Sequence, residues 1–168
     1  MPYDYARDKP VAEELLRRLC IGALVGGIRF GPVPQLLITN QSSNKPPVRG
    51  QVYLNLESSW RIYPARPAAL PRGETEIEEP DEAEALRQLC ELRETVIANV
   101  ELGTDAPDLL VTFADGRVFF LNGRHEQYES WQFGIAFAPN VGALIVACPG
   151  NQIAVWSLPE VSAGAPAV

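Results

Sequence analysis

The sequence predicts an α+β domain built from two similar units, each a helix followed by an antiparallel β-meander. The first observation is internal similarity: residues 16–20 (LRRLC) and 34–39 (PQLLIT) recur as residues 86–90 (LRQLC) and 107–112 (PDLLVT). A period of about 70 residues is typical of one duplicated supersecondary unit, which indicates internal pseudo-twofold symmetry. The second observation is the length of 168 residues. A single unit of about 55 to 70 residues would have a marginal core alone, so one shared core is favoured.

Further matches between the halves support the duplication. They pair residues 24–31 with 96–103, residues 50–53 with 116–119, and residues 59–60 with 130–131. The last match predicts that Trp60 and Trp131 occupy equivalent sites in the common core. The single domain is expected over residues 1–160, with repeats at 8–63 and 81–134, a closing hairpin at 143–157, a Pro-rich and acidic linker at 65–80, and a flexible tail at 161–168.

Each unit is predicted to begin with an amphipathic helix. In the first unit, Asp8 is the expected cap and Pro10 suits the first turn, where N–H groups lack intrahelical partners. The apolar face of this helix is Val11, Leu15 and Leu19.

The second helix is predicted to begin after Pro80, with Asp81 as the cap and Glu84 three positions later, as in a capping box. Its buried stripe is Leu86, Leu89 and Cys90. Cys20 and Cys90 follow equivalent leucines, and both are predicted to be small buried thiols.

Strands are predicted after each helix from runs of β-branched and apolar residues closed by turn residues. The ranges are 23–30, 36–39 and 51–56 in the first unit, 95–102, 109–113 and 117–121 in the second, and a fourth segment in each that ends on Trp60 or Trp131. A final hairpin, residues 143–147 and 152–156, turns at Pro149-Gly150, which suits a type II turn. We expect the meanders to join or face each other, with both helices covering one side.

The acidity of the chain is confined to one segment. Seven of the 21 acidic residues lie within eleven positions without an intervening base: Glu74, Glu76, Glu78, Glu79, Asp81, Glu82 and Glu84. The remaining 14 acids balance the 14 bases. This acidic run indicates either a solvated linker or a surface that attracts a basic partner. No cluster of Lys or Arg is present, so nucleic-acid binding is not expected.

Motifs that carry catalysis, metals or cofactors are missing from the sequence. His125 is the single histidine, which excludes a histidine-rich metal site, and no CxxC pair occurs. The glycine-rich residues 22–31 lack the lysine and Ser/Thr of a phosphate-binding loop, so they are interpreted as a strand in which glycine relieves crowding. We therefore expect no metal, no cofactor and no enzymatic activity. A site assembled from Cys148, His125 and Glu129 is the enzyme alternative.

The aromatic residues are interpreted as core plugs at the ends of the sheet. They are Trp60, Trp131 and Trp156, with Tyr63, Tyr128 and Phe133. The N-terminal residues show no signal peptide, and the longest apolar stretch, residues 20–28, is shorter than the roughly 20 residues that span a bilayer. A cytoplasmic location away from membranes is expected.

The C-terminal half resembles a known family of small bacterial proteins. Residues 128–132 (YESWQ) resemble its YE-x-W segment, and residues 149–156 (PGNQIAVW) resemble its PGG-x-hydrophobic-A-V-W hairpin, with Asn151 in place of the second glycine. The family is of uncharacterised function, and the resemblance implies no catalytic residues. In size and acidity its members are similar to immunity proteins encoded beside secreted toxins.

Two functions follow as expectations. The first is a non-enzymatic, cytoplasmic immunity protein that neutralises a cognate bacterial toxin by direct binding and occlusion of its active site. Because many toxins have basic clefts, the seven residues of the acidic run are the expected contact. The alternative is a regulatory module that binds a small molecule or peptide in a pocket between the two meanders.

Overall fold

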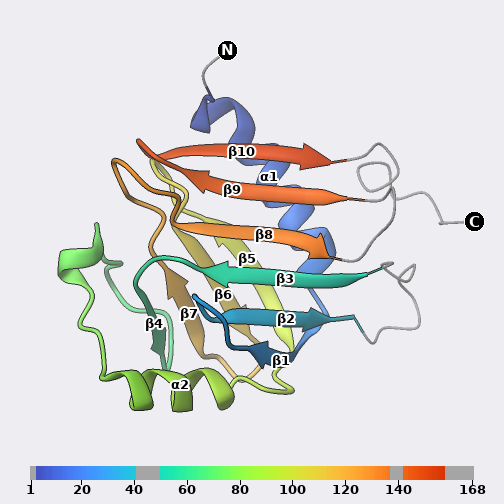
Figure 1. Cartoon of the computed structure of the whole chain (residues 1–168), viewed down its shortest axis with the longest axis vertical. Coiled ribbons are helices and arrows are strands. Elements are labelled where there is room, and N and C mark those ends of the chain that lie inside the picture. The colour runs from blue at the N-terminus through green and yellow to red at the C-terminus, as the bar shows by residue number, and fades with distance from the viewer. Residues whose placement is uncertain (1–2, 41–49, 137–141, 158–168) are drawn as a thin grey trace, which may run out of the picture.

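The fold is α+β, as the sequence predicts. The computed structural model describes residues 3–40, 50–136 and 142–157, and this part contains two α-helices and ten strands in two antiparallel sheets (Figure 1). The helices are α1 (Tyr5–Cys20) and α2 (Glu82–Cys90), with a short 3-10 helix η1 (Glu74–Glu76). The strands are β1 (Leu24–Arg29), β2 (Gln35–Thr39), β3 (Gln51–Leu56), β4 (Trp60–Tyr63), β5 (Ile97–Leu102), β6 (Leu109–Phe113), β7 (Val118–Leu121), β8 (Trp131–Ala136), β9 (Ala143–Cys148) and β10 (Gln152–Ser157). The predicted tail, residues 161–168, lies outside the described residues.

The two halves of the chain exchange strands. Sheet A has the order β1-β2-β3-β8-β9-β10, and sheet B has the order β4-β7-β6-β5. The meander of the first half is thus extended by β8 from the second half, and the meander of the second half is extended by β4 from the first. The two meanders face each other, and neither sheet is made by one half alone.

The sheets meet at one edge, where β1 and β5 run antiparallel. Leu24 bridges Val96, Gly22 N–H donates to Ile97 O at 2.8 Å, and Glu94 N–H donates to Val25 O at 2.8 Å. Leu24 and Val96 are predicted equivalents of each other, and the same offset of 72 residues relates the two hydrogen bonds, because it matches Gly22 with Glu94 and Val25 with Ile97. This junction is therefore symmetric, while the origin of the two halves by duplication remains a prediction.

Two of the residue equivalences are wrong in register. The match of residues 34–39 with 107–112 makes Leu36 equivalent to Leu109. Leu36 pairs with Leu54 on β3, and Leu109 pairs with Leu121 on β7, so Leu54 and Leu121 are equivalent as well. Trp60 lies opposite Leu121, but the residue opposite Leu54 is Phe133. By the same pairing Val52 corresponds to Phe119 and not to Val118.

The two indoles consequently have unlike surroundings. Trp131 is completely buried and donates from Nε1 to Pro107 O at 2.8 Å, whereas Trp60 is half-buried against Phe119. Both tryptophans also begin a strand, whereas each is predicted to end one.

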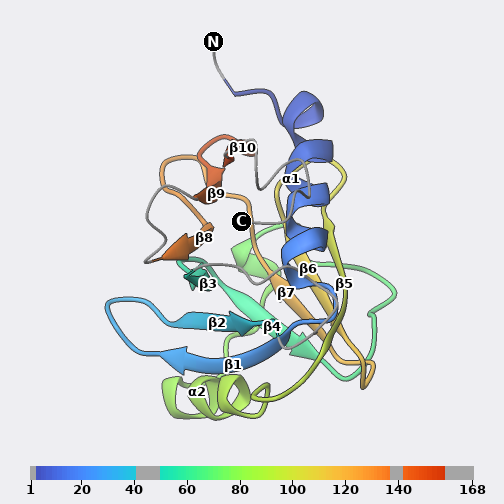
Figure 2. The same cartoon turned by 90° about the vertical axis from the view of Figure 1, so that its right-hand side faces the viewer.

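Helix α1 packs in the angle between the sheets (Figure 2). Its cap is Asp4, whose carboxylate accepts from Arg7 N–H at 3.2 Å. The predicted cap at Asp8 is therefore wrong, and Asp8 instead pairs with Arg7.

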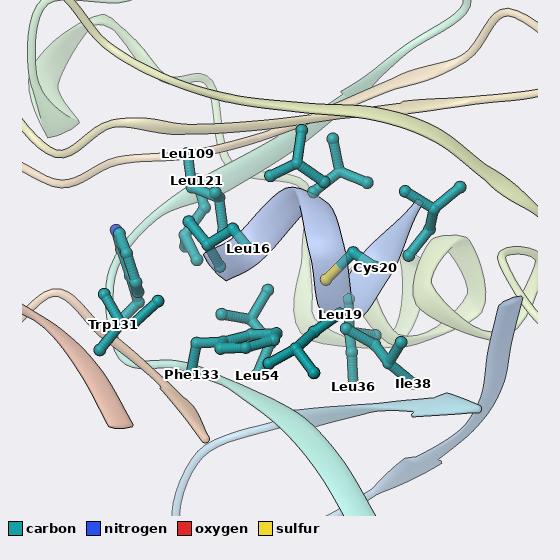
Figure 3. Close-up of a cluster of buried hydrophobic side chains, with 14 of the residues drawn as sticks. Leu16, Leu19, Cys20, Leu36, Ile38, Leu54, Leu109, Leu121, Trp131 and Phe133 are labelled. Atoms are coloured by element: carbon teal, nitrogen blue, oxygen red, sulfur yellow. The ribbon is translucent and has the colours of Figure 1, made fainter. Parts of the chain in front are cut away.

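The C-terminal half of α1 fills the core. Leu16, Leu19 and Cys20 point toward side chains of both sheets, among them Leu36, Ile38, Leu54, Leu109, Leu121, Trp131 and Phe133 (Figure 3). Val11 is 54% exposed, contrary to prediction, because it lies on the outer side of the helix: Ala12 beside it and Tyr5 in the first turn are both buried.

Helix α2 begins as predicted, with the Asp81 carboxylate accepting from Glu84 N–H at 3.0 Å. Its position is not as predicted, since it lies outside the sheets near β1 (Figure 2). Only Leu89 of this helix is buried, and Cys90 is exposed. The two helices therefore do not cover one side together, and their cysteines are not equivalent.

The closing hairpin of β9 and β10 is confirmed. Gly150 and Asn151 have φ values of 71° and 60°, a region that glycine and asparagine tolerate best. Asparagine is therefore suited to position 151 of this turn.

Trp156 and Tyr128 are 49% and 66% exposed, so the prediction that their side chains fill the core is wrong. No described helix is long and apolar enough to cross a membrane.

The loop between β7 and β8 is held against the loop between β5 and β6. The buried Asp108 carboxylate accepts from Gly123 N–H and from Arg124 Nε, each at 2.9 Å. A Cβ atom on Gly123 would lie 2.0 Å from Pro107 O, so the backbones approach too closely for any side chain.

Gly123→Ala should lower the free energy of unfolding by about 2–3 kcal/mol, because the added methyl group must displace backbone. Gly73→Ala is the matched control, since a Cβ there would meet no atom within 4 Å, and it should change stability by less than about 0.5 kcal/mol. Denaturant unfolding of both variants measures the difference. Equal losses would contradict this account of Gly123.

Candidate functional site

The acidic run lies on a segment that is packed against the protein. Residues 64–80 connect β4 with α2, and Ile77 is only 6% exposed. Its side chain joins a small apolar cluster with Leu110, Val118 and Phe120 on the outer face of sheet B. The backbone that carries the acidic residues is thereby held in place by burial.

Hydrogen bonds fix several of the carboxylates. The hydroxyl of Ser58 donates to Glu74 at 2.8 Å, and the hydroxyl of Ser59 donates to Glu79. Glu76 accepts from Arg72 N–H at 2.9 Å. These contacts orient the run without neutralising it.

The part of the run within α2 differs in environment. Asp81 caps the helix, and Glu84 accepts from Arg87 and Gln88. The hydrogen bonds from Arg87 lower the pKa of Glu84 to about 2. Glu78 and Glu82 are exposed and have no partner within the described ranges. They are the carboxylates most available to an outside cation.

The seven residues follow one another along η1, the connection to α2 and the first turn of α2, and we call this stretch the acidic surface: Glu74, Glu76, Glu78, Glu79, Asp81, Glu82 and Glu84. All except Glu84 are exposed. In the described part of the chain, no group of three or more His, Cys, Asp or Glu residues is placed to hold a metal ion. The acidic surface is suited to contact with a basic protein surface.

The residues of the enzyme alternative come into the same region but are not arranged for nucleophilic chemistry. Gly150 N–H donates to His125 O at 2.9 Å, so the loops that carry His125 and Cys148 touch. His125 Nδ1 accepts from the backbone N–H groups of Gln127 and Tyr128. Burial raises the pKa of the Cys148 thiol, and the Glu129 charge raises it further. This thiol is protonated at neutral pH, and a thiol attacks far more slowly than a thiolate.

Sequence reasoning missed a pair of carboxylates on sheet A. Glu57 follows β3 and Glu129 precedes β8, so the pairing of these strands brings the two together. Burial raises the pKa of Glu57, and the Glu129 charge raises it further. Because the two residues are far apart in the sequence, no local spacing could have indicated the pair.

The expected pocket between the meanders is absent from the described structure, because that space is filled by α1 and by fully buried side chains such as Trp131 and Phe133. A groove of about 370 Å³ lies instead between α1 and β10. Its lining includes Tyr3, Val11 and Trp156.

These features define a two-sheet α+β protein with an anchored acidic surface. Residues 36–157 match the model of a family of unknown function, DUF6188. That match covers more than half of the chain, and the protein belongs to this family. No curated protein and no solved structure matches the chain.

Cysteine reactivity checks the protonated, buried state of Cys148. Cys90 is exposed, whereas Cys20 and Cys148 are buried. Cys90 of the native protein should therefore attack DTNB rapidly, forming a mixed disulfide and releasing one equivalent of 2-nitro-5-thiobenzoate, and the other two thiols should react only on unfolding. Cys90→Ser should abolish the rapid reaction. Rapid labelling of Cys148 in that variant would contradict the protonated state inferred above.

Ile77→Ala tests the anchoring of the acidic surface. Loss of this buried side chain should lower the free energy of unfolding by about 2–3 kcal/mol and speed amide exchange in residues 64–80. Thr75→Ala, at an exposed neighbouring position, is the control and should leave both unchanged. Slow exchange in the Ile77 variant would show that the segment is held by other contacts.

Proposed function

We propose that this protein is a non-enzymatic binding protein, and in its most specific form an immunity protein that neutralises a cognate toxin by covering the toxin's active site. The observation that carries the proposal is the acidic surface, whose carboxylates project from a backbone anchored by Ile77 and by the hydroxyls of Ser58 and Ser59.

Anchoring matters because binding costs conformational entropy. A flexible acidic linker would lose that entropy when a partner fixes it, whereas a segment already held against sheet B loses less. Glu78 and Glu82 are solvated and unpaired within the described ranges, so they are free to form charge-assisted hydrogen bonds with Arg or Lys of a partner.

The location of the negative charge favours a basic partner. Outside the acidic surface the chain is neutral, with 14 acids and 14 bases. A charge confined to one surface accelerates encounter with an opposite charge and orients the two proteins. A basic active-site cleft, such as that of an enzyme acting on nucleic acid, would present the matching charge.

Capture from a lysate of the native organism tests the proposal. Wild type should retain a protein with a basic surface, and E76Q/E78Q/E82Q should weaken retention by roughly tenfold or more, since each lost charge contact is worth a substantial factor. The control E14Q/E94Q/E126Q removes the same number of exposed acidic charges elsewhere and should bind like wild type. Binding should also weaken as salt is raised.

Growth assays test the immunity function separately from binding. The captured partner, expressed alone, should arrest growth, and co-expression with wild type should restore growth, whereas co-expression with E76Q/E78Q/E82Q should not. An adjacent gene encoding the captured protein would agree with this function. Absence of any captured protein, or equal retention by both triple variants, would overturn the proposed binding surface.

A further inference from the structure

β10 is an edge strand of sheet A and differs in composition from the other edge strands. β10 ends sheet A, and no strand within residues 3–40, 50–136 and 142–157 pairs with its outer side. Its six residues, QIAVWS, include no charge and no proline. Edge strands of monomeric proteins usually carry such residues, because an open edge pairs with other chains.

Each of the other edge strands is partly covered or carries a charge, and β1 ends on Arg29. β1 and β5 bond to one another near Leu24 and Val96. Further along β5, α1 covers the edge: Glu13 accepts from Leu102 N–H at 3.0 Å, and Arg17 donates to Val100 O at 2.9 Å. β4 has only four residues, contains Arg61 and is followed by Pro64.

Beside the β10 edge lies an exposed apolar surface. Tyr3, Val11 and Trp156 are 47%, 54% and 49% exposed, and all three line the groove of about 370 Å³ between α1 and β10. The rings of Tyr3 and Trp156 pack edge to face with their centroids 6.3 Å apart. Exposed Trp and Tyr side chains of this kind are typical of the residues that dominate binding interfaces.

The groove carries no net charge. Its two charged residues, Arg7 and Asp8, pair with each other at 2.7 Å. α2, which carries Glu82 and Glu84 of the acidic surface, is at the bottom of Figure 1, whereas β10 is at the top. Two copies that meet at this groove therefore bring no unpaired charge of the groove against a like charge.

We propose that β10 pairs antiparallel with β10 of a second copy, forming a twofold dimer with a continuous sheet and with Trp156 and Val11 buried at the contact. An antiparallel pair of identical strands satisfies the twofold symmetry required of a closed dimer. The uncharged strand is compatible with itself, whereas a basic partner would find no charge to bind at this groove. The dimer does not depend on the proposed function of the acidic surface.

Sedimentation of the full chain over a range of concentrations tests the dimer. Wild type should shift with concentration from 18.4 kDa toward twice that mass. Trp156→Lys places a charge on the edge and removes the exposed indole, so self-association should weaken by roughly 30-fold or more, the effect of losing a dominant interface residue. Val11→Lys, on a different element, should weaken it as well.

Phe30→Lys is the matched control. Phe30 is 58% exposed and follows β1, the strand at the opposite edge of sheet A, so this variant should associate like wild type. Circular dichroism and thermal unfolding show whether each variant is folded. The salt dependence of association distinguishes this contact from one made by the acidic surface, because the affinity of a neutral interface should change little with ionic strength.

Three results would overturn the proposal: a monomer at every concentration, a dimer that persists in folded Trp156→Lys and Val11→Lys, or a dimer that dissociates as salt is raised. A monomer that instead binds extended apolar peptides along β10 would show that the edge serves another partner.

Discussion

The exchange of a strand between the two halves is the constraint on which the structure depends. β8 extends the meander of the first half, and β4 extends the meander of the second. Each sheet is complete only when both halves are folded, so the halves share one core around α1 (Figure 3). Neither half can bury its apolar face alone, which makes the folding of the two halves a single cooperative event.

This exchange also determines where the acidic residues lie. Because β4 is at the far edge of sheet B and α2 lies near β1, residues 64–80 must pass over the outer face of sheet B. Burial of Ile77 on that face holds the passage in place. A segment that has the composition of a linker is thereby held against sheet B, and the backbone that carries its carboxylates is anchored.

Two parts of the molecule differ in chemistry. The acidic surface carries unneutralised carboxylates, while the groove beside β10 is neutral and has exposed aromatic residues. Charge acts over several ångströms and promotes encounter, whereas an open strand edge forms directional hydrogen bonds at contact.

Local signals in the sequence were sufficient for the α+β class, for most strands, for the Asp81 cap and for the final hairpin, because caps, turns and alternation act within a few residues. They also located the acidic residues. The exchange of β4 and β8, the separate positions of the two helices, the offset between Trp60 and Trp131, and the Glu57–Glu129 pair were decided by tertiary structure alone. Each depends on pairing between residues distant in the sequence, where a shift of one position moves every side chain to the other face of a sheet.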